Sequence, residues 1–192
     1  MTNRKAKPVL FRRKRERKTD YKKRLRTLMS EKPRLVVRIS KTKIITQIIN
    51  FDVKGDLVLS GLDSTYLTSK GWNYSLKNIP AAYLTGYALA NKVKGKIEGQ
   101  VILDTGLLTP LKKGKVYAFL KGAIDGGLDV ICGNDEIFPS KERISGKSIQ
   151  EYATTLKKDD KTKFEKLFSA NLKNKADPTK MVETFEKVKE SI

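Results

Sequence analysis

The feature that most constrains this chain is residues 11–29, a stretch that reads FRRKRERKTDYKKRLRTLM. It holds ten Lys or Arg against two acids, with only a few apolar side chains between them. Burying a charge without a partner costs much free energy, so this stretch cannot fold by enclosing its own side chains. Its cations therefore require an anionic partner that lies outside the stretch.

The positive charge is concentrated in the N-terminal part of the chain. The protein has 192 residues and a formal net charge of +20. Residues 1–43 hold 18 basic and 3 acidic side chains, whereas residues 44–140 hold 10 and 9. A compact core tolerates little self-repulsion, so the near-neutral middle segment is expected to form the folded body. A surface as basic as the N-terminal part attracts polyanions, and nucleic acid is the first candidate.

Residue types that are rare or missing exclude several classes of function. The chain has no histidine, which excludes Ser-His-Asp and Cys-His catalytic sites and metals held by histidine. The single cysteine, Cys132, cannot form an internal disulfide, and we interpret it as a small buried side chain in a reducing compartment. No apolar run is long enough for a signal peptide or a membrane span. We therefore predict a soluble, cytoplasmic protein with no cofactor, no metal site and no membrane partner.

The first predicted segment is a basic arm, residues 1–30. Residues 1–18 lack apolar periodicity and are expected to be extended or disordered without a partner. Thr19 or Asp20 can cap a short helix that follows. The apolar side chains of this helix recur at helical spacing: Tyr21, Leu25, Leu28 and Met29. We expect the helix to dock by this stripe, with its cations pointing outward.

The second predicted segment is an α/β body, residues 31–147. Three β-branched runs separated by SKTK and DVKGD predict a three-stranded antiparallel meander. In the first run, Leu35, Val37 and Ile39 alternate with arginines, so one face goes to the core and the other presents Arg34 and Arg38. Asn78 caps a predicted helix, and then follow a strand at VILDTG, a helix at KVYAFLKGAIDGG and a short strand at LDVI. This order predicts a mixed sheet covered by helices.

The third predicted segment is a helical tail, residues 148–192. Three helical patterns follow one another, and Asp177 with Pro178 marks the start of the last. The apolar residues of this last helix share one face: Met181, Val182, Phe185 and Val188. We expect the tail to pack on the body or on a neighbouring molecule.

Two basic clusters are candidates for binding phosphate. Ten cations in nineteen residues, continued by arginines on a strand, favour RNA or DNA backbone binding, with Phe11 and Tyr21 available for stacking. A localisation signal and a merely solubilising charge run are the alternatives. The LKKGK turn places Lys112, Lys113 and Lys115 at a helix start, where a phosphate is favoured, although a solvated turn has the same composition. The turn does not match a nucleotide-binding P-loop, because Thr109 and Val116 stand where that motif needs Gly and Ser or Thr.

Two further motifs have competing interpretations. Asp104, at a strand end, would suit a two-metal nuclease of the ribonuclease-H type, but the first strand offers no second carboxylate, so a cap or turn role is favoured. Trp72 and Tyr74, in KGWNYSLKN, are able to stack on bases or to pack in the core, and core packing is favoured for a lone tryptophan.

The chain resembles a known family through motifs that occur in the same order and spacing. The most specific are KTDY, NIPAAYLTG and LKGAIDGGL, and others are KPRLVVR, VILDTGL and FPSKERISGKSIQEY. They resemble the archaeal and eukaryotic branch of the large-subunit ribosomal protein eighteen family over about residues 8–155. The resemblance implies a non-catalytic protein that binds 5S rRNA and attaches it to large-subunit rRNA in the central protuberance. It also implies neighbouring large-subunit proteins as partners, among them the other 5S rRNA-binding protein.

The resemblance and the basic pattern together give one set of expected RNA contacts, which lie on the arm, the first strand, the following turn and the LKKGK segment. The expected contacts are Arg12, Arg13, Lys14, Arg15, Arg17, Lys18, Tyr21, Lys22, Lys23, Arg24, Arg26, Arg34, Arg38, Lys41, Lys43, Lys112, Lys113 and Lys115. Asp63 is left out, because it stands where family members commonly have a histidine and an acid weakens any contact with phosphate. A basic module that binds RNA or DNA without a fixed target remains the alternative from composition alone.

Overall fold

The computed structural model describes residues 9–97 and 99–192, and the expectation of disorder for residues 1–8 lies outside the described residues. The elements are, in chain order, α1 (Arg12–Arg15), α2 (Tyr21–Leu28), β1 (Arg34–Ile39), β2 (Ile44–Asn50), β3 (Leu57–Asp63), α3 (Tyr66–Ser69), α4 (Ile79–Val93), β4 (Ile102–Asp104), α5 (Lys115–Asp125), η1 (Asp135–Ile137), α6 (Lys141–Ser145), α7 (Lys147–Asp159), α8 (Lys161–Leu167), α9 (Ser169–Lys173), η2 (Pro178–Lys180) and α10 (Met181–Ser191).

The centre of the molecule is a four-stranded mixed sheet in the order β3-β2-β1-β4. Strands β1, β2 and β3 form the predicted antiparallel meander, and β4 pairs in parallel with β1. The first strand alternates as expected, because Leu35 and Val37 enter the core. The LDVI segment forms no strand of the sheet and contributes only a single bridge between Val130 and Val101. The predicted α/β class and the mixed sheet are confirmed.

The two central helices, α4 and α5, cover one face of this sheet and build the main core. Asn78 caps α4 as predicted, since its side-chain oxygen accepts a hydrogen bond from the Ala81 amide at 2.8 Å. The core side chains of the sheet and these helices form one cluster that includes Leu35, Ile48, Leu89 and Phe119. This face of the sheet is therefore closed by apolar packing.

Helices α4 and α5 approach each other closely at two glycines. A Cβ atom on Gly122 would lie 2.0 Å from the carbonyl oxygen of Tyr83, and one on Gly86 would lie 2.1 Å from that of Phe119. Neither distance is compatible with a side chain, because backbone atoms cannot give way as a flexible side chain does. The close contact of the two helices thus requires glycine at both positions.

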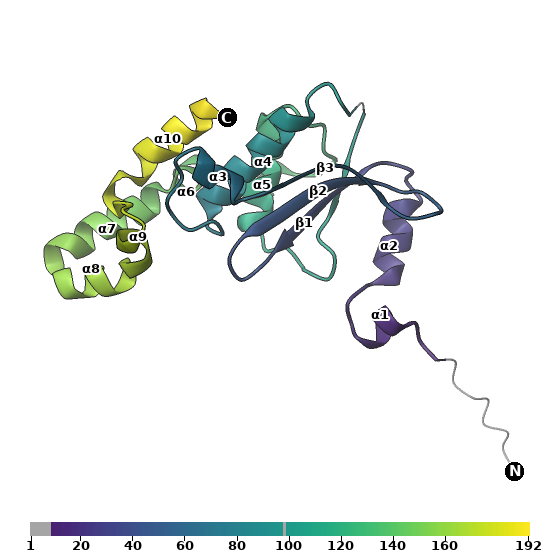
Figure 1. Cartoon of the computed structure of the whole chain (residues 1–192), viewed down its shortest axis with the longest axis horizontal. Coiled ribbons are helices and arrows are strands. Elements are labelled where there is room, and N and C mark those ends of the chain that lie inside the picture. Colours follow the sequence, from purple (N-terminus) through teal and green to yellow (C-terminus); the bar gives the residue numbers. More distant parts are fainter. Residues whose placement is uncertain (1–8, 98) are drawn as a thin grey trace, which may run out of the picture.

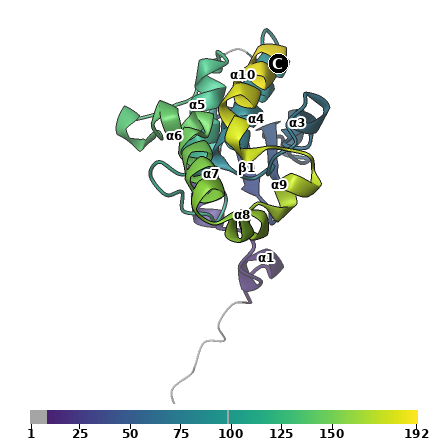
Figure 2. The same ribbon diagram turned by 90° about the vertical axis from the view of Figure 1, so that its left-hand side faces the viewer.

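The tail packs on the body through a second apolar cluster. Met181, Phe185 and Val188 of α10 are buried against Trp72 and other residues of the body, which confirms three residues of the predicted apolar face, whereas Val182 is half-buried. Trp72 is fully buried, which confirms its core interpretation. Helices α7 to α10 lie at the end of the molecule opposite α1 and α2, and Figure 2 views this end directly. No helix in the described part of the chain is long and apolar enough to cross a membrane.

Candidate nucleic-acid interface

The basic arm begins with one helical turn whose side chains are all exposed. Residues 12–15 form α1, which contains no buried residue, whereas the sequence predicted that residues 1–18 are extended or disordered without a partner. The Arg13 Nε donates a hydrogen bond to Thr19 Oγ1 at 2.8 Å, and the ring of Phe11 lies 5.7 Å from that of Tyr21. These local contacts shape the turn but leave its cations at the surface. Every predicted contact from Arg12 to Lys18 is exposed.

Helix α2 starts as predicted, but it presents the opposite face to the body. The Asp20 carboxylate caps it by accepting hydrogen bonds from the amides of Lys22 and Lys23. Three residues of the apolar stripe expected to dock are exposed: Tyr21, Leu25 at 62% and Met29 at 75% of full exposure. Leu28 is half-buried, and no residue of α2 is fully buried. The docking prediction was wrong for Tyr21, Leu25 and Met29, because apolar spacing does not reveal the Asp56 carboxylate and the Thr105 and Gly106 oxygens that bind Arg24 and Lys23.

The face of α2 that meets the body is polar. The Lys23 Nζ donates to Thr105 Oγ1 at 3.0 Å and to the carbonyl oxygen of Gly106 at 2.9 Å. The Arg24 Nη2 lies 2.9 Å from the Asp56 carboxylate in the turn between β2 and β3. Two consecutive cations of the helix thus reach two separate loops, so they fix the orientation of α2 over the edge of the sheet.

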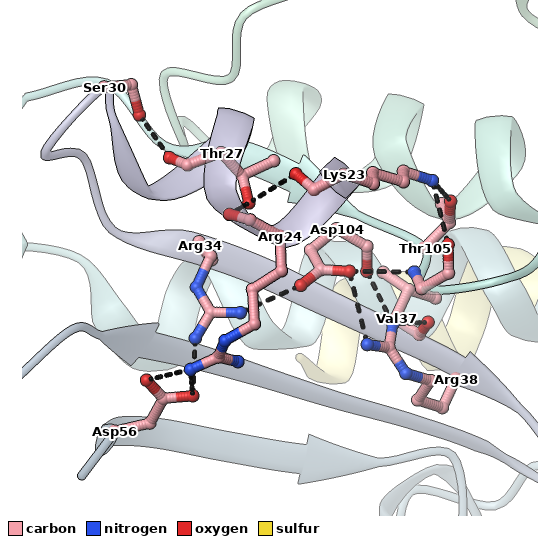
Figure 3. A network of polar contacts seen from close by, with 11 residues as sticks. Lys23, Arg24, Thr27, Ser30, Arg34, Val37, Arg38, Asp56, Asp104 and Thr105 are labelled. Carbon is pink, nitrogen blue, oxygen red and sulfur yellow. Dashed lines mark hydrogen bonds and ion pairs between the residues drawn. The ribbon is translucent and has the colours of Figure 1, made fainter. Parts of the chain in front are cut away.

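Arg34, the first residue of β1, lies beneath this contact and joins its two carboxylates. Its Nη2 is 2.6 Å from Asp56 and its Nη1 is 3.0 Å from Asp104, and Arg38 reaches the other oxygen of Asp104 at 3.2 Å. Figure 3 shows Arg34 between the two acids, with Arg24 sharing Asp56. We call these six residues the α2 network: Lys23, Arg24, Arg34, Arg38, Asp56 and Asp104.

Burial in the α2 network corrects the prediction for Arg34. Its side chain keeps only 3% of its full exposure, so this arginine is not presented to a ligand as expected. The alternation along β1 placed it on the correct face, but Asp56 and Asp104 occupy both terminal nitrogens of its guanidinium group. Arg38 lies four residues further along β1, and its side chain stays 45% exposed at the surface, as the alternation predicted.

The two acids of the α2 network stay ionised at neutral pH. Burial alone would raise the pKa of the Asp56 carboxyl, but hydrogen bonds and charge from Arg34 and Arg24 outweigh it and hold this pKa below its ordinary value. Burial likewise opposes ionisation of Asp104, and its pKa is nevertheless lowered by the Gly106 amide and by the neighbouring arginines. Both carboxylates therefore hold their cations throughout the physiological pH range.

The remaining predicted contacts lie in two other places. Lys41 and Lys43 belong to the turn between β1 and β2, at the opposite end of β1 from Arg34. Lys41 is exposed, whereas Lys43 forms an ion pair with Asp63, which lowers the pKa of that carboxyl. The third set, Lys112, Lys113 and Lys115, is exposed on the loop and first turn that lead into α5.

Asp104, the acid considered for a nuclease site, contacts a backbone amide and two arginines. Asp104 bonds the Gly106 amide at 2.8 Å, as a turn residue does, and its other contacts are arginines rather than carboxylates. Among residues 9–97 and 99–192, no group of three or more acidic or cysteine side chains is placed to hold a metal ion. Asp104 therefore has the contacts of a turn residue, as the sequence favoured.

Sequence reasoning missed the structural partners of the arm. Asp56 lies 32 residues from Arg24, and Thr105 lies 82 residues from Lys23. No local spacing relates such residues, because the meander and the parallel strand β4 bring them together. The sequence did contain one indication of these contacts. Asp56 and Asp104 are acids next to predicted strand ends in a chain rich in cations, and such acids are expected to bind cations.

Comparison with known proteins shows the family to which this chain is similar. A family model described as ribosomal large subunit proteins 60S L5 and 50S L18 matches residues 5–100. The protein named large ribosomal subunit protein uL18 from Korarchaeum cryptofilum (strain OPF8) is 45% identical over 184 residues, which cover 96% of this chain and 93% of the relative. The residues that the family model matches include the KTDY and NIPAAYLTG motifs that carried the resemblance. The chain belongs to the uL18 family of large-subunit ribosomal proteins.

Proposed function

We propose that this protein binds 5S rRNA through its basic arm and helps to attach it to large-subunit rRNA in the central protuberance. Membership of the uL18 family makes the chain a structural component of the cytoplasmic ribosome. The observation that supports the finer assignment is the exposed basic surface of α1 and α2, of which α2 is held on the body by the α2 network.

Exposed guanidinium and ammonium groups of the arm would neutralise phosphates of the RNA backbone. The residues proposed for this role on the arm are Arg12, Arg13, Lys14, Arg15, Arg17, Lys18, Lys22 and Arg26. Arg38 of β1 is also bound to Asp104, but it stays 45% exposed and adds a further cation to this surface. Neutralised phosphates release condensed counterions, so binding of this kind weakens steeply as salt rises. Tyr21, which is exposed beside Phe11, supplies a surface on which a base can stack.

The other predicted contacts would extend this surface. Lys112, Lys113 and Lys115 are exposed at the start of α5, where backbone amides also favour a phosphate. Lys23, Arg24 and Lys43 already have acceptors on the protein, so their part in RNA binding is secondary to their structural contacts. The partners that follow from this proposal are 5S rRNA, large-subunit rRNA and neighbouring large-subunit proteins, including the other protein that binds 5S rRNA.

The role that we propose is structural and not catalytic. Asp104 is the acid that a nuclease would need, and it is held by Arg34 and Arg38. Labelled RNA incubated with the protein and Mg²⁺ or Mn²⁺ should therefore stay intact. Cleavage that an Asp104→Ala change abolishes would instead establish a nuclease.

The proposal is tested by competition for labelled 5S rRNA at about 50 and 200 mM salt, the range over which phosphate contacts lose most affinity. Unlabelled 5S rRNA, tRNA and a random RNA duplex serve as competitors. We expect 5S rRNA to compete better than the other two at the higher salt. Equal competition by all three would show that charge alone drives binding, and it would leave a generic basic module as the better description.

A further inference from the structure

Helix α2 cannot hold its position by the usual means. It has eight residues, and an isolated helix shorter than about 12 residues is marginal in water. Helices in proteins are normally stabilised by burying an apolar face, but no residue of α2 is buried: its apolar residues Tyr21 and Leu25 are exposed, and Leu28 is only half-buried. Its place on the body therefore depends on polar contacts.

Asp56 is the main acidic anchor for these contacts. One of its oxygens lies 2.9 Å from Arg24 of α2, and the other lies 2.6 Å from Arg34 of β1. It thus links the helix to a buried arginine of the sheet, whose position the strand fixes. Asp104 completes the frame by holding Arg34 from the other side and Arg38 beyond it.

A carboxylate in the middle of a phosphate-binding surface is unfavourable when charge alone is considered. Asp56 repels phosphate, and replacing it by a neutral residue would raise the net charge and release Arg24 as a further free cation. Counterion release then predicts tighter binding to any RNA. If Asp56 nevertheless helps RNA binding, it must do so by fixing the position of α2. Replacing Asp56 therefore weakens RNA binding if its role is positional, and strengthens RNA binding if it only repels phosphate.

We propose that Asp56 and Asp104 are positioning residues, which fix α2 on the sheet and thereby set the preference of this protein for its own RNA over other RNA. The inference rests on the proposed binding of 5S rRNA. With α2 fixed, the cations of the arm meet phosphates in one spacing, which suits one RNA shape. With α2 released, the same cations bind any polyanion.

The first arm of the test needs no RNA. Amide hydrogen exchange is measured over α2 and α4 in the full-length protein and in Asp56→Asn and Asp52→Asn variants. Asp52→Asn is the matched control, because Asp52 lies in the same turn and its replacement changes the charge by the same amount. The Asp52 side chain accepts a hydrogen bond from the Lys54 amide, and an asparagine side chain is able to accept the same bond. We expect Asp56→Asn to lower protection of α2 only, and unchanged α2 protection would overturn the inference.

The second arm measures affinity for 5S rRNA and for random duplex. If the docked fraction of α2 falls to about a tenth, the dissociation constant for 5S rRNA should rise about tenfold, because only the docked state binds it well. Binding of random duplex should stay the same or tighten. A variant Asp56→Asn that binds 5S rRNA as tightly as the wild type, or more tightly, would overturn the positioning role.

A third variant guards against a general loss of folding. Thr105→Val changes no charge, and it removes the hydroxyl that accepts a hydrogen bond from the Lys23 ammonium and donates one to the Leu108 carbonyl oxygen. Exchange over α4 is measured beside that over α2 to show that the body stays folded. Thr105→Val should shift α2 exchange and 5S affinity in the same direction as Asp56→Asn. If the wild type shows no preference for 5S rRNA, the proposed function fails, and the exchange result alone then decides whether Asp56 positions α2.

Discussion

Replacing three arginines of α1 should flatten the salt dependence of RNA binding by a definite amount. Arg12, Arg13 and Arg15 are exposed, and the ion pair of Arg12 with Glu16 at 3.8 Å is a surface contact of little energetic weight. Each phosphate contact contributes about 0.7 to 0.9 to the slope of log affinity against log salt. The triple change to alanine should lower the magnitude of the slope by about 2 to 3.

This change of slope is measurable as a ratio of affinities for 5S rRNA. Between about 50 and 200 mM salt, the wild type should lose about 20- to 40-fold more affinity than the triple variant. The matched control replaces Lys158, Lys163 and Lys166 of the tail by alanine, which removes the same charge from the opposite end of the molecule. An unchanged slope in the arm variant, or an equal change in the tail variant, would remove the arm from the interface.

Four further outcomes follow from the structure. Gly122→Ala should destabilise the fold by about 3 kcal/mol in urea unfolding, because its Cβ would lie 2.0 Å from the Tyr83 carbonyl oxygen. Leu25→Ser and Met29→Ser should each change the free energy of unfolding by less than about 0.5 kcal/mol, since both side chains are exposed. Burial and then a carboxylate neighbour raise the pKa of Tyr83 in the folded protein. The neutral phenol therefore stabilises the fold fully below about pH 10, and this stabilisation is lost as the pH rises further. Tyr83→Phe should lose less free energy of unfolding than the wild type on alkaline titration. The lowered pKa of Asp104 implies that its carboxylate stabilises the fold fully above about pH 4 and that this stabilisation is lost as the pH falls further. The stability of Asp104→Asn should therefore depend less on pH in the acid range than that of the wild type.

The body of the fold was predictable because its signals are local. Alternation in β1 gave the core face that contains Leu35 and Val37, and Asn78 marked the start of α4. The spacing of Met181, Phe185 and Val188 gave the buried face of the last helix. In each of these places, apolar burial and the local pattern favour the same structure.

The arm was the place where local pattern and structure disagreed. Hydrophobic periodicity predicted docking through a stripe of Tyr21, Leu25, Leu28 and Met29, of which only Leu28 is half-buried. The polar contacts that hold the helix come instead from Lys23 and Arg24. The reason is that the acceptors come from distant turns, and their position depends on the completed sheet. Burial of Arg34 escaped prediction for the same reason, because a strand pattern gives the face of a residue and not what covers it.

The most direct test of the central claim is to map which part of the protein lies against 5S rRNA. A Cys132→Ser background leaves no other cysteine, and a single new cysteine at Lys14 on α1 or at Lys163 on α8 carries a tethered iron chelate that cleaves nearby RNA. We predict localised cuts in 5S rRNA from the probe at Lys14 and none above background from the probe at Lys163. Cuts from the tail position alone, or equal scattered cuts from both positions, would contradict binding through the arm.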